Sequence, residues 1–206
     1  MIDSRLLLDL PARSVYCVRG AGPAVFYVAD AEGGGVLVNT PAFSPGLLQE
    51  LSRLAPPRFA FYPSRLGARD VAAWRAAGIQ TLAYGGEFRG VDGAVDIVLD
   101  REYRFSRTID FLPMSGRTAG TCALRCKNQP AIIFFGPALE CGESGWPEMV
   151  AHADDYSYEN RLLGAVGLRH LKYEYAFTDD FDPRTSRCGP GAGAAIAARL
   201  EMVLSV

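Results

Sequence analysis

Histidine is scarce in this chain of 206 residues, which holds only His152 and His170. The two residues lie far apart in the sequence and do not form any recognised metal-chelating spacing. A catalytic zinc site needs about three protein ligands from histidine, cysteine or acidic side chains, in addition to the bound water. We therefore expect both histidines to lie at the surface or at helix ends rather than in a metal centre.

The sequence also lacks an excess of either charge and any long apolar run. The 21 basic and 23 acidic residues give a formal net charge of −2, which offers no cationic surface for a phosphate backbone. No apolar run approaches the ~18 residues that a membrane span needs. The amino terminus has no basic start, and its apolar run ends at Asp9. We expect a cytoplasmic protein that binds neither nucleic acid nor membranes.

The five cysteines are an odd number and are spread thinly, which is not typical of a secreted disulfide framework. We expect reduced thiols. Cys122 and Cys126 lie on one predicted strand, where four steps of ~3.3 Å separate their α-carbons by ~13 Å. That distance is too long for one disulfide or one metal ion, so we interpret them as small residues on one face of a sheet.

Hydrophobic residues make up 49% of the chain and charged residues 21%, as in ordinary globular domains. The length fits one large domain, and we predict a single domain over residues 1–206. Short β-rich runs alternate with helical patterns, which is typical of an α/β layered fold. The cluster Glu32-Gly33-Gly34-Gly35 predicts a tight hairpin turn. Strands are predicted at about residues 15–19, 24–29, 36–39, 58–62, 81–84, 95–98, 109–112, 121–127, 131–135 and 173–178, and helices at about 45–54, 68–77, 158–168 and 191–205.

Four segments carry a resemblance to a known family. The segments are Val36-Leu37-Val38-Asn39-Thr40, Tyr62-Pro63-Ser64-Arg65-Leu66-Gly67-Ala68, Met114-Ser115-Gly116-Arg117-Thr118-Ala119-Gly120-Thr121 and Phe134-Phe135-Gly136-Pro137-Ala138-Leu139. In position and flanking residues, the first resembles the early hairpin of the metallo-β-lactamase superfamily, which ends in an aliphatic-Asp-Thr-Gly turn, and the other three resemble metal-binding segments of that superfamily. The resemblance implies an αββα sandwich, in which two mixed β-sheets are flanked by helices. It also implies a metal site at one edge, between the sheets.

The departures from the family pattern are as informative as the matches. At the positions of the family's ligands, none of the following side chains can donate a lone pair to a metal: Pro63, Arg65, Gly67, Ala68, Arg117 and Pro137. Only Asp179, near the position of the last ligand histidine, could do so. Because zinc needs about four nitrogen, sulfur or oxygen ligands, the resemblance implies a member without the zinc site and without metal-activated water. We predict no metal, no cofactor and no catalytic residues of the usual family type.

The resemblance places Arg65 and Arg117 where two metal-binding histidines would converge, with Asp179 and Asp180 nearby. Buried guanidinium groups are costly unless they are paired. Our favoured hypothesis is a structural plug of arginine and aspartate. The alternative is an anion-binding pocket for a carboxylate or phosphate.

For function, we favour a non-catalytic, pseudoenzyme-like protein that binds a protein partner or a small anionic ligand and could form a homodimer. The competing hypothesis is a hydrolase-like enzyme that uses a different metal or none. Its centre would be the acidic loops with Asp154, Asp155, Asp179 and Asp180. Aromatic residues could serve an interface or the core, and the candidates are Trp74, Phe88, Trp146 and Tyr156.

Overall fold

The computed structural model describes residues 4–31, 33–91, 95–100, 102 and 105–205. The chain forms two compact units, Met1–Leu99 and Asp100–Val206, and each is described by itself. The prediction of a single domain over residues 1–206 stays a prediction. Among the described residues, no helix has the length and apolarity needed to cross a bilayer.

The first unit is built on a seven-stranded mixed sheet whose strands lie in sequence order. Its first four strands form an antiparallel meander, and the last four are parallel. Helices α1 (Pro45–Leu54) and α2 (Val71–Ala76) connect the parallel strands β4 to β6. The strands are β1 (Ser4–Leu10), β2 (Arg13–Val18), β3 (Val25–Asp30), β4 (Gly34–Val38), β5 (Pro57–Tyr62), β6 (Gln80–Tyr84) and β7 (Ile97–Leu99).

Helix α1 matches its sequence prediction because its start is specified locally. The Ser44 hydroxyl accepts a hydrogen bond from the Leu47 N–H, and Pro45 occupies the first turn. Helix α2 begins later than the predicted residue 68. Asp70 has a left-handed backbone with φ of 47°, which a continuous α-helix cannot include, and a short 3-10 turn, η1 (Arg65–Gly67), precedes it.

Both helices of the first unit pack on one face of its sheet. Leu51 of α1 and Trp74 of α2 belong to the same buried cluster as Tyr27, Leu37 and Tyr62 on the strands. Apolar side chains that alternate with these, such as those of Phe26, Val38 and Phe61, are also buried. The strands therefore form continuous apolar runs in the sequence rather than alternating patterns.

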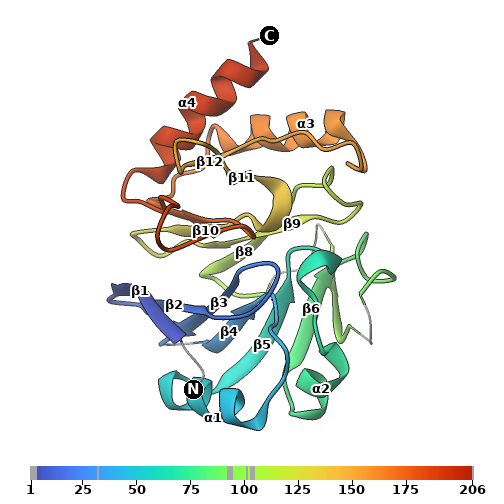
Figure 1. Ribbon diagram of the computed structural model, residues 1–206, viewed down its shortest axis with the longest axis vertical. Helices are drawn as coiled ribbons and strands as arrows, with labels where there is room; N and C mark the ends of the chain where they lie inside the picture. Colours follow the sequence, from blue (N-terminus) through green and yellow to red (C-terminus); the bar gives the residue numbers. More distant parts are fainter. Residues whose placement is uncertain (1–3, 32, 92–94, 101, 103–104, 206) are drawn as a thin grey trace. The chain divides into compact units, whose positions relative to one another are not determined.

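The second unit has a four-stranded mixed sheet in the order β13-β10-β9-β8, with one parallel pair, β10 and β13. Helices α3 (Tyr158–Leu168) and α4 (Ala192–Leu204) contribute to one buried cluster with one face of this sheet, and they lie side by side in Figure 1. The strands are β8 (Ile109–Pro113), β9 (Cys122–Cys126), β10 (Ile132–Phe134) and β13 (Tyr175–Phe177). Between β10 and α3 lie the 3-10 turn η2 (Gly136–Ala138) and the short hairpin of β11 (Glu140–Cys141) and β12 (Pro147–Glu148).

The sequence predictions missed one long strand and two short ones. In strand β1 the apolar residues do not alternate cleanly with polar ones, so its only sequence signal is a short apolar run before Asp9. The strand nevertheless pairs with β2 along most of its length. The predicted hairpin at the glycine cluster is present as the β3–β4 pair, although Glu32 lies outside the described residues. Cys122 and Cys126 are buried on β9, and none of the five cysteines, all of which the structure describes, takes part in a disulfide.

We expect Gly35→Ala to destabilise the first unit strongly. A Cβ at Gly35 would lie 1.7 Å from the Tyr27 hydroxyl oxygen, and the Tyr27 ring is fully buried. The expected loss is about 2–4 kcal/mol in the free energy of unfolding, as in other overpacked cores. Urea denaturation measures it. Gly20→Ala is the control, because its Cβ would meet Pro41 at an ordinary 3.5 Å; equal losses for both variants would contradict the prediction.

Candidate functional site

Arg65 lies in the turn that follows β5 in the first unit. Its backbone N–H donates to Glu87 Oε2 at 2.7 Å, and its guanidinium Nη1 lies 3.5 Å from Glu87 Oε1. The Glu87 carboxylate is fully buried, whereas about half of the Arg65 side chain is exposed. The sequence analysis did not identify Glu87, because a single acid in a glycine-rich loop carries no pattern. Arg65 is thus already paired within its own unit.

Gly67 stands at the position of a ligand aspartate in the family pattern. A Cβ at Gly67 would lie only 1.9 Å from Asn39 Oδ1. Asn39 has a left-handed backbone with φ of 63°, which asparagine tolerates better than most residues. Its side-chain amide donates to the Ala24 carbonyl at 2.9 Å, and its own backbone N–H donates to Phe61. The Asn39 side chain therefore fills the space that a side chain at residue 67 would need.

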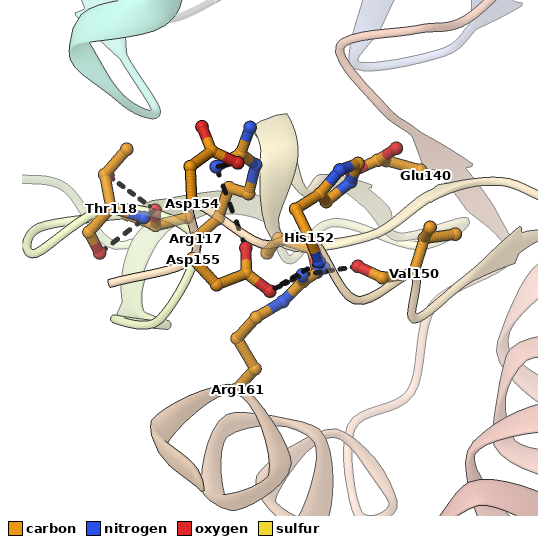
Figure 2. A network of polar contacts seen from close by, with 10 residues as sticks. Arg117, Thr118, Glu140, Val150, His152, Asp154, Asp155 and Arg161 are labelled. Carbon is orange, nitrogen blue, oxygen red and sulfur yellow. Dashed lines mark hydrogen bonds and ion pairs between the residues drawn. The ribbon is translucent and has the colours of Figure 1, made fainter. Parts of the chain in front are cut away.

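Arg117 lies in the loop between β8 and β9 of the second unit. Its guanidinium Nη1 lies 3.1 Å from Asp154 Oδ1 and 3.7 Å from Asp155 Oδ1. The Asp154 carboxylate is largely exposed, and the Asp155 carboxylate is buried. Figure 2 shows Arg117 turned toward both acids. Backbone hydrogen bonds also join this loop to the start of α3, since Ser157 donates to the Gly116 carbonyl.

Arg161 is a buried arginine that the sequence analysis missed. Its guanidinium Nη1 lies 2.7 Å from Asp155 Oδ2 and also donates to the Val150 carbonyl. Its Nη2 donates to the Ala138 carbonyl at 3.1 Å, in the turn η2. Arg161 shares the buried face of α3 with Ala165 and Leu168. A charged residue in that apolar stripe was the signal that could have identified it.

Two arginines and two aspartates thus form one ion-pair network, made of Arg117, Asp154, Asp155 and Arg161 (Figure 2). Asp155 is its centre, because its carboxylate contacts both guanidinium groups and also accepts the His152 backbone N–H at 3.1 Å. Burial acts to raise the pKa of Asp155. The His152 hydrogen bond, Arg161 and Arg117 outweigh it, and together they hold the pKa below its usual value.

The two histidines have different surroundings. His152 Nε2 lies 2.5 Å from Glu140 Oε1, and both side chains are partly exposed. Figure 2 shows the two side chains next to each other. His170 is exposed and follows Arg169, the residue that caps the end of α3. The helix-end position expected for a histidine is confirmed for His170, while His152 is part of a polar pair beside the ion-pair network.

Asp179 and Asp180 lie directly after β13. The Asp179 backbone N–H donates to the Gly136 carbonyl at 3.1 Å, which places Asp179 beside the turn η2. The Asp180 carboxylate accepts hydrogen bonds from the Thr178 hydroxyl at 2.6 Å and from the Cys141 backbone N–H. Glu87, Asp154 and Asp155 are the acids found in ion pairs with Arg65 and Arg117. The convergence of Arg65 and Arg117 in one cleft stays a prediction.

The donor set does not fit a zinc ion. In the second unit the ligand positions hold Arg117, which is cationic, and Pro137, which has no side-chain donor. The buried Arg161 next to η2 adds another side chain that offers only N–H donors, and its partner Asp155 already contacts both guanidinium groups. Among the described residues, no group of three or more histidine, cysteine or acidic side chains could hold a metal ion.

Solved structures with the same fold are metallo-β-lactamases. One from Pontibacter korlensis is 14% identical, with a TM-score of 0.71, and 98% of each chain is covered. One from Hirschia baltica is 12% identical, with a TM-score of 0.66, over 96% of this chain and 97% of the other. The mono-zinc form of one from Pseudomonas aeruginosa is 15% identical, with a TM-score of 0.65, over 98% and 96%.

These likenesses confirm the predicted fold class: the chain has the metallo-β-lactamase fold, with two mixed sheets and flanking helices. Neither a family model nor a curated protein sequence matches the chain. The identities are too low to carry an activity over from these enzymes. The chain therefore shares their fold, while its residues at the ligand positions are different in chemical kind.

We expect the buried pair of Arg161 and Asp155 to couple strongly in a double-mutant cycle. Removing one partner leaves the other charge buried, so Arg161→Met should cost about 3–5 kcal/mol in the free energy of unfolding. Adding Asp155→Asn to this variant should cost less than Asp155→Asn costs alone. Urea denaturation measures the cycle. Arg169→Met is the control on the same helix, because its pair with Glu201 is more exposed and should be worth less than about 1 kcal/mol. If the losses in unfolding free energy from Arg161→Met and Asp155→Asn were additive in the double variant, the predicted coupling between the two residues would be wrong.

The lowered pKa of Asp155 predicts a defined pH dependence. A carboxyl whose pKa is lower in the folded state than its unfolded value of about 3.9 stabilises the fold above that pH. This contribution is lost as the pH falls through the folded pKa. The difference in unfolding free energy between wild type and Asp155→Asn should therefore be constant near neutrality and shrink below about pH 4. Denaturation at a series of pH values tests this, and a difference that grew in acid would contradict it.

Proposed function

We propose that this chain is a non-catalytic protein of the metallo-β-lactamase fold that acts by binding a partner. The observation that carries the proposal is the buried guanidinium of Arg161, which donates to the Ala138 carbonyl in η2, the turn where the resemblance implies a metal-bridging acid. Guanidinium groups offer only N–H donors, and Asp155, the buried acid beside them, already contacts both Arg161 and Arg117. The arrangement favours a closed structural network over a metal-activated water.

The balance of charges supports the structural plug over an anion-binding pocket. Arg117 and Arg161 are matched by Asp154 and Asp155, so the ion-pair network has no net positive charge. A bound carboxylate or phosphate would have to displace these acids from the two arginines. A structural plug of arginine and aspartate is therefore favoured, with Arg117, Arg161, Asp154 and Asp155 as its members rather than the predicted set of Arg65, Arg117, Asp179 and Asp180.

The alternative, a hydrolase-like enzyme centred on the acidic loops, has less support. Asp155 is held by Arg161, and its lowered pKa makes it a weak base. The Asp180 carboxylate accepts hydrogen bonds from Thr178 and from the Cys141 backbone. The Cys141 thiol, which is partly buried, has a raised pKa because of burial, so little of it is the nucleophilic thiolate at neutral pH.

Metal loading tests the proposal directly. We expect the purified chain, incubated with excess Zn²⁺ and then desalted, to retain far less than one zinc per chain in elemental analysis, because the ligand positions lack lone pairs. We also expect no hydrolysis of a chromogenic cephalosporin. The metallo-β-lactamase from Pontibacter korlensis, treated in parallel, is the control for loading and assay.

Two outcomes would overturn the proposal or a part of it. Stoichiometric zinc or iron that supports hydrolysis would show that the chain is an enzyme. Tight binding of inorganic phosphate, measured by calorimetry and lost in Arg117→Ala, would replace the structural plug with an anion pocket. Binding of phosphate that is unchanged in that variant would leave the plug intact and place the anion elsewhere.

A further inference from the structure

Helix α3 carries apolar residues on both of its faces. Ala165 and Leu168 point into the core of the second unit, whereas Leu163 and Val166 lie on the opposite face. Leu163 is 70% exposed, the highest value among the large apolar side chains that the structure describes. A helix that is apolar all round is usually buried on all sides. Helix α1 exposes Gln49, Ser52 and Arg53, and its exposed apolar side chain, Leu54, is only 36% exposed and lies at its last position.

The charges at the two ends of this outer face have opposite sign. Glu159 is exposed in the first turn of α3, and Arg169 and His170 follow its last turn. Residues 159, 163 and 166 are spaced by four and three positions, which keeps them on one stripe of α3, and His170 follows in the turn after the helix. We call the set of Glu159, Leu163, Val166 and His170 the α3 surface. In sequence order, the α3 surface therefore holds an acid, two apolar side chains and a base.

We propose that the α3 surface binds the α3 surface of a second copy of this chain, with the two helices antiparallel. A twofold axis between residues 164 and 165 would place Leu163 against Val166 of the other copy and Glu159 against its His170. Each contact is then made twice, as a symmetric dimer requires. A parallel pair would instead bring Glu159 against Glu159. The charge pattern therefore selects one orientation, and the antiparallel helix dipoles favour the same one.

The area of the α3 surface determines how tightly we expect two copies to bind. Stable dimers bury about 800 Å² on each partner, and one helix of 11 residues offers less than that. Tyr156 and Tyr158 are exposed at the start of the helix and can enlarge the contact. We therefore expect a weak dimer with a Kd of about 10–100 μM, rather than an obligate one.

This inference rests on the proposed function in one respect, because it supplies the partner for a binding role. Its failure is distinguishable from failure of that proposal. Metal content and hydrolysis decide whether the chain is an enzyme, whereas sedimentation decides whether the α3 surface associates. An active zinc enzyme could still dimerise, and a metal-free chain could still be monomeric.

Sedimentation velocity from about 1 to 500 μM tests the dimer. We expect the wild-type sedimentation coefficient to rise with concentration, and Leu163→Glu to weaken association at least about tenfold, because a carboxylate would be buried at the centre. Met202→Glu is the matched control: Met202 is 66% exposed on α4, outside the α3 surface. Circular dichroism checks that each variant is folded.

A charge exchange tests the orientation. Glu159→Arg alone should weaken the dimer, because His170 of the other copy would lose its carboxylate partner and the introduced guanidinium would lie near Arg169 of the other copy. Combined with His170→Glu, it should restore association to near the wild-type Kd, because the pair is then reversed in sign. Failure of the double variant to recover would overturn the antiparallel arrangement. A wild-type chain that stays monomeric at about 500 μM, or a dimer that Leu163→Glu and Met202→Glu affect equally, would overturn the whole inference and leave the surface to another kind of partner.

Discussion

A guanidinium group out of contact with water must find acceptors for its N–H groups, and in the second unit this requirement applies to Arg161. Its acceptors come from three separate places in the chain: the turn η2, the loop at Val150 and the carboxylate of Asp155. Because they must all lie within hydrogen-bond distance of one side chain, Arg161 fixes these loops to α3. The position of Arg117 follows from this, since Asp155 is shared between the two arginines.

Most of the fold could be predicted from the sequence because its elements are specified locally. Helices α1 and α3 begin at serine caps, and the strands of both sheets have apolar runs bounded by turn residues. Strand β1 could not be predicted in this way, since its stability comes from pairing with β2 rather than from its own pattern. The start of α2 was misplaced for a similar reason: the backbone of Asp70 is set by its surroundings, among them the Phe43 N–H that its carboxylate accepts.

The candidate site could be predicted only in part. The resemblance singled out Arg65 and Arg117 and paired them with Asp179 and Asp180, whereas in the structure Arg117 pairs with Asp154 and Asp155, and Arg65 pairs with Glu87. Such pairs depend on tertiary contacts between residues far apart in the sequence. An arginine pairs with the acid that the fold brings near it, and no local spacing in the sequence identifies that acid. The fold itself, by contrast, does not depend on the residues of the metal site. This is expected, because one fold can carry many different functional sites.

The contact between Gly67 and Asn39 has a consequence for engineering a metal ligand into this chain. Asn39 keeps its unusual backbone through hydrogen bonds to Ala24 and Phe61, so its side chain cannot easily move away from residue 67. Placing an aspartate at residue 67 would drive its Cβ into that amide, so the acid could be introduced only together with a change at residue 39. A single substitution at residue 67 would therefore disrupt the packing of this loop before it could supply an oxygen ligand.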